Sequence, residues 1–130
     1  MNIGQAAAAS GISAKMIRHY ESIALIPQSA RSESGYRIYT DRDVHTLRFI
    51  RRARSLGFSL ERIRELLSLW QDAGRASADV KTIALQHVGE LERRIAELSE
   101  MRDTLAQLAD CCHGDRRPDC PILQSLAEKR

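Results

Sequence analysis

The longest regular pattern of apolar positions lies between residues 79 and 110. Apolar side chains recur there every three or four residues, at Ala84, Val88, Leu91, Ile95, Leu98, Met101, Leu105 and Leu108. This spacing approximates a coiled-coil seam and predicts one long helix. A single helix of roughly 30 residues cannot bury such a stripe by itself. The pattern therefore predicts a partner helix, most simply from a second copy of the chain, and leaves its orientation open.

Two short helical segments at the N-terminus predict a helix-turn-helix. Residues 3–9 are rich in alanine, and Ser10-Gly11 then ends the helix because glycine adopts the left-handed turn readily. Ser13 is a good N-cap for a second helix, from Ala14 to about Glu21. Many helical hairpins share this pattern, so DNA binding and a purely structural hairpin remain alternatives. The second helix offers three side chains to DNA phosphates and base edges, Lys15, Arg18 and Tyr20.

Residues 27–40 interrupt the helical pattern with proline, serine and glycine. The segment 35–39, Gly-Tyr-Arg-Ile-Tyr, alternates and is rich in strand formers, which predicts a small β-hairpin, or wing. An aromatic or aliphatic side chain of this segment could pack the hairpin onto the helices, and we expect this of Ile38. The candidate contacts of the wing to the DNA backbone are Arg31, Tyr36 and Arg37.

Two amphipathic helices follow the hairpin. Thr40 caps the first, which ends at Gly57, and Ser59 caps the second, from Leu60 to about Trp70. Their apolar residues are expected to form the core, and four arginines make the first helix basic. These residues are Val44, Leu47, Phe49, Ile50, Ala53, Leu56, Ile63, Leu66, Leu67 and Trp70, with Arg48, Arg51, Arg52 and Arg54.

The patterns together predict a mainly α-helical protein of four parts. These are a winged helix-turn-helix DNA-binding domain at 1–70, a connector at 71–78, a dimerisation helix at 79–110, and a metal-binding loop with a terminal helix at 111–130. The low aromatic content of 5% agrees with an all-helical chain. A length of 130 residues suffices for one small domain and an extended element.

The charge is distributed unevenly along the chain. Residues 1–70 contain 11 Lys/Arg and 6 Asp/Glu, a balance of +5, whereas residues 71–130 contain 9 and 11, a balance of −2. A basic N-terminal half favours a polyanionic partner such as nucleic acid, with an ordinary solvated surface as the alternative. No apolar run is long enough to span a membrane, and the N-terminus lacks the pattern of a signal peptide. We therefore expect a cytoplasmic protein.

The three cysteines of the chain all lie near the C-terminus. Cys112 and Cys120 flank a loop of seven residues, Cys111 precedes it, and Pro121 suits the first turn of a helix after it. Cytosolic thiols are mostly reduced, so metal binding is favoured over a disulfide. Two thiolates suit linear Cu(I) or Ag(I), whereas Zn(II) normally takes four ligands, which Cys111 and His113 could complete. Adjacent cysteines on a helix point about 100° apart, so we expect Cys111 to be left out.

Other classes of protein also carry paired cysteines. A copper chaperone or buffer would need neither the winged head nor the long helix. An enzyme with Cys112 as nucleophile would need a His or Asp constellation that is not apparent. We therefore expect a regulator and not an enzyme.

The chain resembles the MerR family of metal-responsive regulators. The resemblance rests on residues 3–20, the wing at 31–39, the segment 77–81, and Cys112 with Cys120-Pro-Ile. The branch that it resembles most is that of the copper-efflux (CueR-like) regulators. This resemblance implies an antiparallel coiled-coil homodimer that sits on promoter DNA. The metal-bound dimer would bend and untwist the promoter spacer so that RNA polymerase can use both of its elements, and the apo dimer would repress.

The resemblance also implies roles for individual residues. Arg18, Tyr20, Arg31, Tyr36 and Arg37 match positions that contact DNA, and Cys112 and Cys120 match the metal ligands. Ser77 matches the position of a third cysteine in divalent-metal branches, so a hydroxyl there favours Cu(I), Ag(I) or Au(I), and Lys81 one turn later could help to balance charge. The Cys111-Cys112 pair is also known from zinc-sensing relatives, but with a cysteine at position 77 and a longer loop. A regulator of the same fold that responds to zinc or another divalent metal is therefore the alternative.

Overall fold

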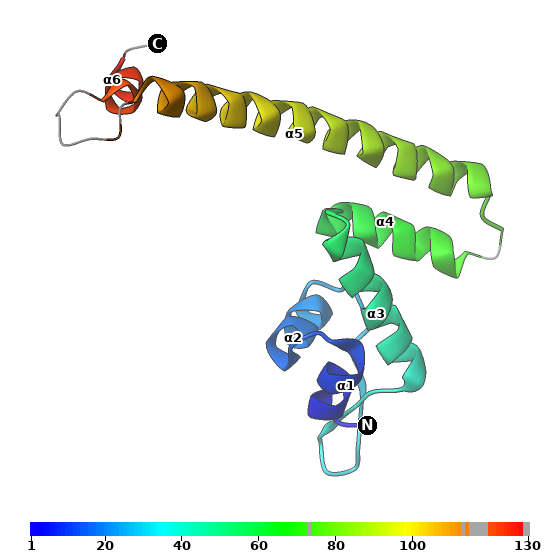
Figure 1. Cartoon of the computed structure of the whole chain (residues 1–130). Coiled ribbons are helices and arrows are strands. Elements are labelled where there is room, and N and C mark those ends of the chain that lie inside the picture. Colours follow the sequence, from blue (N-terminus) through cyan, green and yellow to red (C-terminus); the bar gives the residue numbers. More distant parts are fainter. Residues whose placement is uncertain (73, 113, 115–119, 129–130) are drawn as a thin grey trace. The chain divides into compact units, whose positions relative to one another are not determined.

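The protein is mainly helical, as the sequence predicts (Figure 1). The computed structural model describes residues 1–72, 74–112, 114 and 120–128. Two compact units are formed, Met1–Val80 and Lys81–Arg130. The elements are α1 (Ile3–Ser10), α2 (Ala14–Ser22), β1 (Ala30–Arg31), β2 (Arg37–Ile38), α3 (Asp41–Ser55), α4 (Leu60–Gln71), α5 (Ser77–Cys111) and α6 (Pro121–Ala127).

Local capping determines where the helices of the first unit begin and end. The Ser13 side chain accepts a hydrogen bond from the backbone of Met16 at the start of α2. Thr40 and Asp43 form a reciprocal capping box at the start of α3. Gly11 ends α1 with a φ of 76°, a left-handed conformation that costs other residues more. The helix-turn-helix is therefore specified by short-range contacts.

The core of the first unit lies where α1, α2, α3 and α4 pack together. Ala6, Ile17, Leu47, Ile50 and Ile63 contribute side chains that are completely buried. The buried residues of α3, Val44, Leu47, Ile50 and Ala53, recur every three residues, and Ile63 and Leu67 of α4 lie four apart, which is the spacing of an amphipathic face. The predicted core residues Phe49, Leu66 and Trp70 are only partly buried, and Leu56 is exposed.

The predicted wing is a two-stranded antiparallel hairpin that pairs Ala30 with Ile38 and Arg31 with Arg37. The expectation that Ile38 packs on the helices is wrong, because its side chain is 40% exposed. Tyr39 is the buried residue instead, at 2% exposed. Successive side chains of a strand point to opposite faces. Residues 37 and 39 thus face the helices, and 36 and 38 face outward.

The inward face of the wing is held by a buried carboxylate, that of Glu21 at the end of α2. Glu21 accepts hydrogen bonds from the hydroxyl of Tyr39 and from the backbone N–H of Ser29, and lies 3.6 Å from the guanidinium of Arg37. The side chain of Tyr39 therefore has a raised pKa, first because it is buried and second because of Glu21. These contacts anchor the wing to α2.

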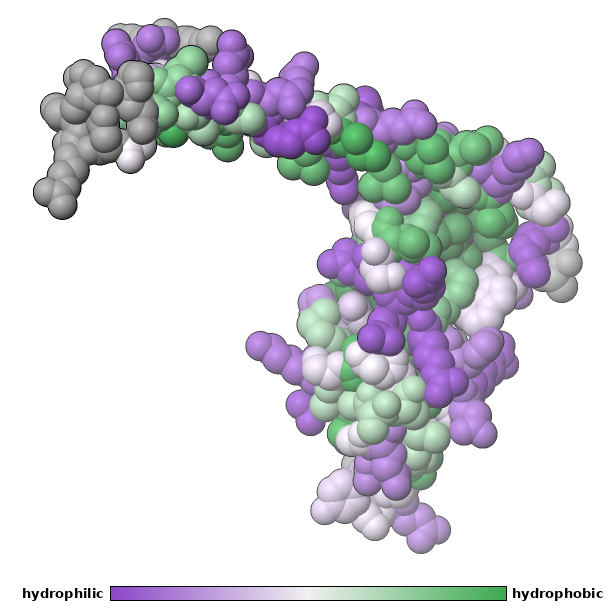
Figure 2. Space-filling view, in the orientation of Figure 1, coloured by the Kyte–Doolittle hydropathy of each residue, from purple (hydrophilic) through white to green (hydrophobic). Residues whose placement is uncertain are grey.

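The helix α5 is one continuous element of 35 residues. It begins at Ser77, two residues before the predicted start, which is within the usual uncertainty of a helix end. Five of the predicted seam residues are 47% to 62% exposed, namely Val88, Ile95, Leu98, Met101 and Leu105. Hydrophobic surface is visible along this helix in Figure 2. Within the described residues, no helix has the length and apolar character needed to cross a membrane.

Candidate functional site

The helix α2 presents two of its three predicted DNA-contacting side chains to solvent. Lys15 and Arg18 are exposed, while Ile17 between them is completely buried and fixes the face that the helix turns outward. Tyr20 differs, because its side chain is a core residue that is only 5% exposed. The structure thus gives Tyr20 a packing role that the sequence did not reveal. A contact of Tyr20 with DNA stays a prediction, and only the small exposed part of its side chain is available for such a contact.

The wing presents a second group of predicted DNA-contacting side chains. Tyr36 is 75% exposed at the turn, and Arg31 is exposed and donates a hydrogen bond from Nη1 to the carbonyl of Gly35 at 3.1 Å. Arg37 is half-buried because it is paired with Glu21. A large exposed aromatic side chain has no packing role within this unit, so Tyr36 is available to a ligand.

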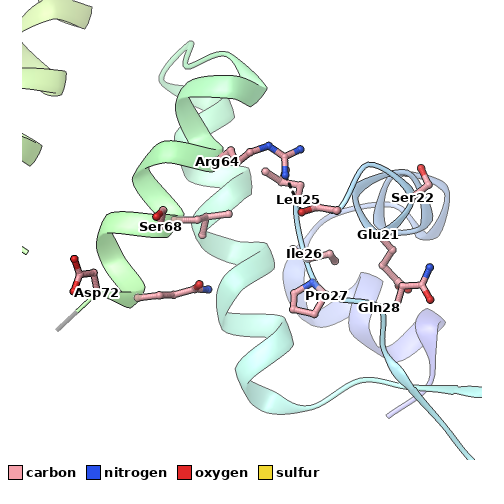
Figure 3. Close-up of a pocket in the computed structure, with 12 residues that line it drawn as sticks. Glu21, Ser22, Leu25, Ile26, Pro27, Gln28, Arg64, Ser68 and Asp72 are labelled. Carbon is pink, nitrogen blue, oxygen red and sulfur yellow. Dashed lines mark hydrogen bonds between the residues drawn. The ribbon is translucent and has the colours of Figure 1, made fainter. Parts of the chain in front are cut away.

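Sequence reasoning missed the residues that hold the segment between α2 and the wing. Arg64 of α4 donates hydrogen bonds of 2.8 Å to the carbonyls of both Ile23 and Ala24, near the end of α2. Figure 3 shows Arg64 reaching from α4 toward the segment that carries Leu25 and Ile26. This segment and α4 line a cavity of about 700 Å³. None of the predicted site residues lines it. Arg64 and the two carbonyls that it contacts lie some 40 residues apart in the chain, so no local pattern could have indicated these hydrogen bonds.

The cysteine loop begins at the last turn of α5 and ends at the start of α6. Cys112 and Cys120 are half-buried, and Cys111, the last residue of α5, is exposed. Cys120 is the N-cap residue of α6, although its sulfur makes no standard capping hydrogen bond. His113, which the sequence offered as a further ligand, lies outside the described residues.

The surroundings of Cys120 favour its thiolate. The backbone amide of Leu123 is the largest influence and lowers the pKa of the thiol, while partial removal from water raises it. The backbone amide of Ile122 and the side chain of Cys112 lower the pKa of Cys120 further. Cys112 is thus one of the groups that favour the thiolate of Cys120. A thiolate is the form of cysteine that binds metal ions.

The two remaining predicted site residues lie at the other end of α5. Ser77 is its first residue and Lys81 lies one turn later, and both are exposed. A helix of 35 residues is about 50 Å long at 1.5 Å per residue. Ser77 and the cysteine loop of the same chain are therefore separated by the whole length of one helix. In the part of the chain that the structure describes, no group of three or more His, Cys, Asp or Glu side chains could hold a metal ion.

Comparison with known proteins identifies the family. Residues 1–70 match the model of the MerR HTH family regulatory protein, and residues 44–108 match that of MerR, DNA binding. The chain is 62% identical to heavy metal-dependent transcription regulator 2 of Rhizobium meliloti, over 98% of this chain and 86% of the relative. It is 46% identical to the HTH-type transcriptional regulator CueR of Salmonella typhimurium, over 98% and 92%.

A solved structure gives the same result for the fold. The transcription regulator PbrR691 from Ralstonia metallidurans, in complex with lead(II), has a TM-score of 0.84 and 32% identity over 98% of this chain and 99% of that one. The relatives are transcription regulators and not enzymes. Family models, relatives and fold agree with the exposed basic helix and the wing. The chain belongs to the MerR family of helix-turn-helix transcriptional regulators.

Proposed function

We propose that this protein is a metal-responsive activator that controls genes for metal efflux or resistance and responds to Cu(I), or to Ag(I) or Au(I). The observation that carries the proposal is the placement of two half-buried cysteines at the two ends of one loop, Cys112 directly after α5 and Cys120 at the N-cap of α6, where the pKa of Cys120 is lowered. Relatives named as a heavy metal-dependent regulator and as CueR support it.

The donor set fits a monovalent soft ion. Thiolates are soft ligands, and two of them suffice for linear coordination, whereas a structural zinc site takes four ligands. A Cu(I) ion bound by two thiolates would give a centre with one net negative charge. The backbone amides of Leu123 and Ile122, which already lower the pKa of Cys120, are suited to compensate that charge.

The protein is proposed to act as an antiparallel homodimer. The exposed apolar seam of α5 needs a partner, because exposed apolar surface of this extent marks an interface. Ser77 and the cysteine loop lie at opposite ends of α5. An antiparallel partner would bring the Ser77 and Lys81 of one copy near the cysteine loop of the other. A hydroxyl in place of a third thiolate there is consistent with a monovalent ion.

The output is proposed to be a change in promoter DNA. The proposed DNA contacts are Lys15, Arg18 and Tyr20 on α2 and Arg31, Tyr36 and Arg37 in the wing. Metal binding would order the loop and α6 and bias the geometry of the two heads. The dimer would then distort the promoter spacer so that RNA polymerase can use both promoter elements. The apo dimer would hold the same promoter repressed.

The identity of the metal is tested by measuring the metal stoichiometry and the absorption spectrum of the reduced dimer. We expect one Cu(I) per cysteine loop with two sulfur ligands, and weak Zn(II) binding. Tight Zn(II) binding through three or four ligands would overturn the assignment.

Footprinting of operator DNA tests the proposed change in the promoter. Both the apo and the metal-bound protein should remain bound, and only the metal-bound form should distort the spacer. Simple release of the protein on metal addition would contradict activation by distortion.

A regulator that responds to a divalent metal is the second candidate. Cys111 is an exposed thiol directly beside Cys112, and the structurally similar PbrR691 was solved with lead(II). Replacement of Cys111 by Ser separates the two candidates. The monovalent site should keep its affinity and stoichiometry, whereas a three-thiolate site would lose both.

A further inference from the structure

A pocket on the basic face of α3 belongs neither to α2 nor to the wing. It has a volume of about 230 Å³ and lies between α3 and the end of α1. Three arginines and two serines line it, namely Arg48, Arg51, Arg52, Ser55 and Ser10. Arg51, Arg52 and Ser55 follow Arg48 by three, four and seven residues, so that the four side chains share one face of α3. Among the residues that the structure describes, no acidic side chain lines the pocket.

Contacts with α1 hold two of the arginines in place. Arg48 donates a hydrogen bond from Nε to the carbonyl of Ala9 at 3.0 Å, which uses one of its five N–H donors. Arg51 lies directly against Gly11, where an added Cβ would be 3.0 Å from both Cζ and Nε of the guanidinium. The absence of a side chain at Gly11 thus lets Arg51 approach the turn. Two members of the cluster are therefore held against the backbone at the end of α1.

The three arginines lack a counter-charge within the described part of the chain. The ion pairs recorded there for other arginines join Arg37 with Glu21, Arg62 with Glu65, and Arg102 with Asp103, and none includes a member of the pocket. Like charges three or four residues apart on a helix destabilise it slightly. Arginines held together without a carboxylate therefore form a site that an anion would stabilise, and a guanidinium matches phosphate oxygens in a bidentate manner.

The position of the pocket indicates the source of the anion. Arg51 contacts Gly11, which lies two residues before Ser13, the N-cap of the helix that carries Lys15 and Arg18. A DNA duplex presents one phosphate charge per roughly 1.7 Å of its axis. A duplex whose groove is contacted by α2 therefore has further phosphates beside this turn. We propose that the pocket of Ser10, Arg48, Arg51, Arg52 and Ser55 binds a backbone phosphate of DNA outside the contacts of α2 and the wing. This inference rests on the proposed DNA binding.

The salt dependence of operator binding tests the proposal in the full-length dimer. Each phosphate contact contributes about 0.9 to the slope of log K against log salt, so loss of one contact per head lowers the slope by about 1.8 per dimer. The variant is the double replacement Arg48→Gln and Arg52→Gln, and the matched control is Arg93→Gln with Arg94→Gln on α5. We expect the shallower slope only in the first variant, with unchanged preference for operator over a scrambled duplex. A slope and affinity equal to those of the wild type would overturn the proposal.

Three controls keep the test decisive. Arg52→Gln alone preserves the bond of Arg48 to Ala9, so it should shift the slope in the same direction even if the double variant folds poorly. Arg18→Ala should abolish specific binding, and a wild type that binds no operator would refute the proposed function itself. Titration with inorganic phosphate tests whether the pocket binds a free phosphate ion instead of a DNA phosphate. Millimolar phosphate binding that requires Arg52, with an unchanged DNA slope, would assign the pocket to a free anion and contradict the DNA assignment.

Discussion

At the scale of single residues, side chains of the same type differ in burial and in the groups that they contact. Tyr39 and Tyr36 lie three positions apart in the wing, yet Tyr39 is buried on Glu21 and Tyr36 is 75% exposed. Cys111 and Cys112 are neighbours, yet Cys112 is half-buried and helps to lower the pKa of Cys120, whereas Cys111 is exposed. In each pair the backbone directs one side chain toward a partner and the other away.

Replacement of Tyr39 by Phe tests the anchor of the wing. Loss of the hydroxyl leaves the buried carboxylate of Glu21 short of one donor, which should cost about 1–3 kcal/mol of stability. The raised pKa of Tyr39 also predicts that wild-type stability is full below pH 10 and falls as the pH rises through that pKa, since unfolding then releases a proton. Urea denaturation at pH 8 and above pH 10 measures both effects. Tyr36→Phe is the control and should change neither.

Replacement of each cysteine by Ser tests the metal site. Cys112→Ser or Cys120→Ser should abolish metal-induced transcription and leave operator affinity unchanged, because the proposed DNA contacts lie in the other unit. Cys111→Ser should preserve induction, since its thiol is exposed on the last turn of α5. In vitro transcription with purified protein and a gel shift provide the two readouts. Loss of induction in the Cys111 variant would show that a third thiolate is needed.

At the scale of elements, the turn between α1 and α2 is constrained twice. Gly11 adopts a positive φ, and the guanidinium of Arg51 occupies the space that a side chain would need. Gly35 in the wing also has a positive φ, but an added Cβ there would meet nothing within 4 Å. The two glycines therefore differ only in the close approach of a neighbour.

Replacement of each glycine by Ala separates conformation from contact. Gly35→Ala should cost about 1 kcal/mol, the usual penalty of the left-handed conformation. Gly11→Ala should cost more, because Arg51 must also move, and it should reduce operator affinity if Arg51 takes part in the phosphate pocket. Thermal denaturation and a gel shift on both variants check this. Equal losses of stability would show that Arg51 adjusts freely.

At the scale of the whole molecule, the exposed seam of α5 is the proposed dimer interface. A charged residue introduced in the centre of an apolar interface is costly unless it is paired. Leu98→Glu should therefore convert a dimer into monomers and weaken operator binding, because two linked heads bind DNA far more tightly than one. Sedimentation equilibrium measures the assembly. The control is Arg94→Glu, outside the seam, which should remain dimeric.

Much of the fold could be predicted because its signals are local. Helix ends depend on contacts within four residues, as in Ser13 with Met16 and Thr40 with Asp43, and these ends were found within about two residues. The period of the α5 seam and the spacing of Cys112 and Cys120 are likewise visible in the chain itself. The sequence by itself thus determined the order of elements, the family and the candidate metal ligands.

Only the tertiary structure decided which side chains face inward between elements. The sequence could not show that Tyr20 is a core residue, that Tyr39 and not Ile38 is buried, or that Glu21 anchors Arg37. It also could not show that Gly11 lets Arg51 approach the turn beside α2. These contacts join residues that lie far apart in the chain. They depend on how helices and strands are oriented in space, which no periodicity within one element encodes.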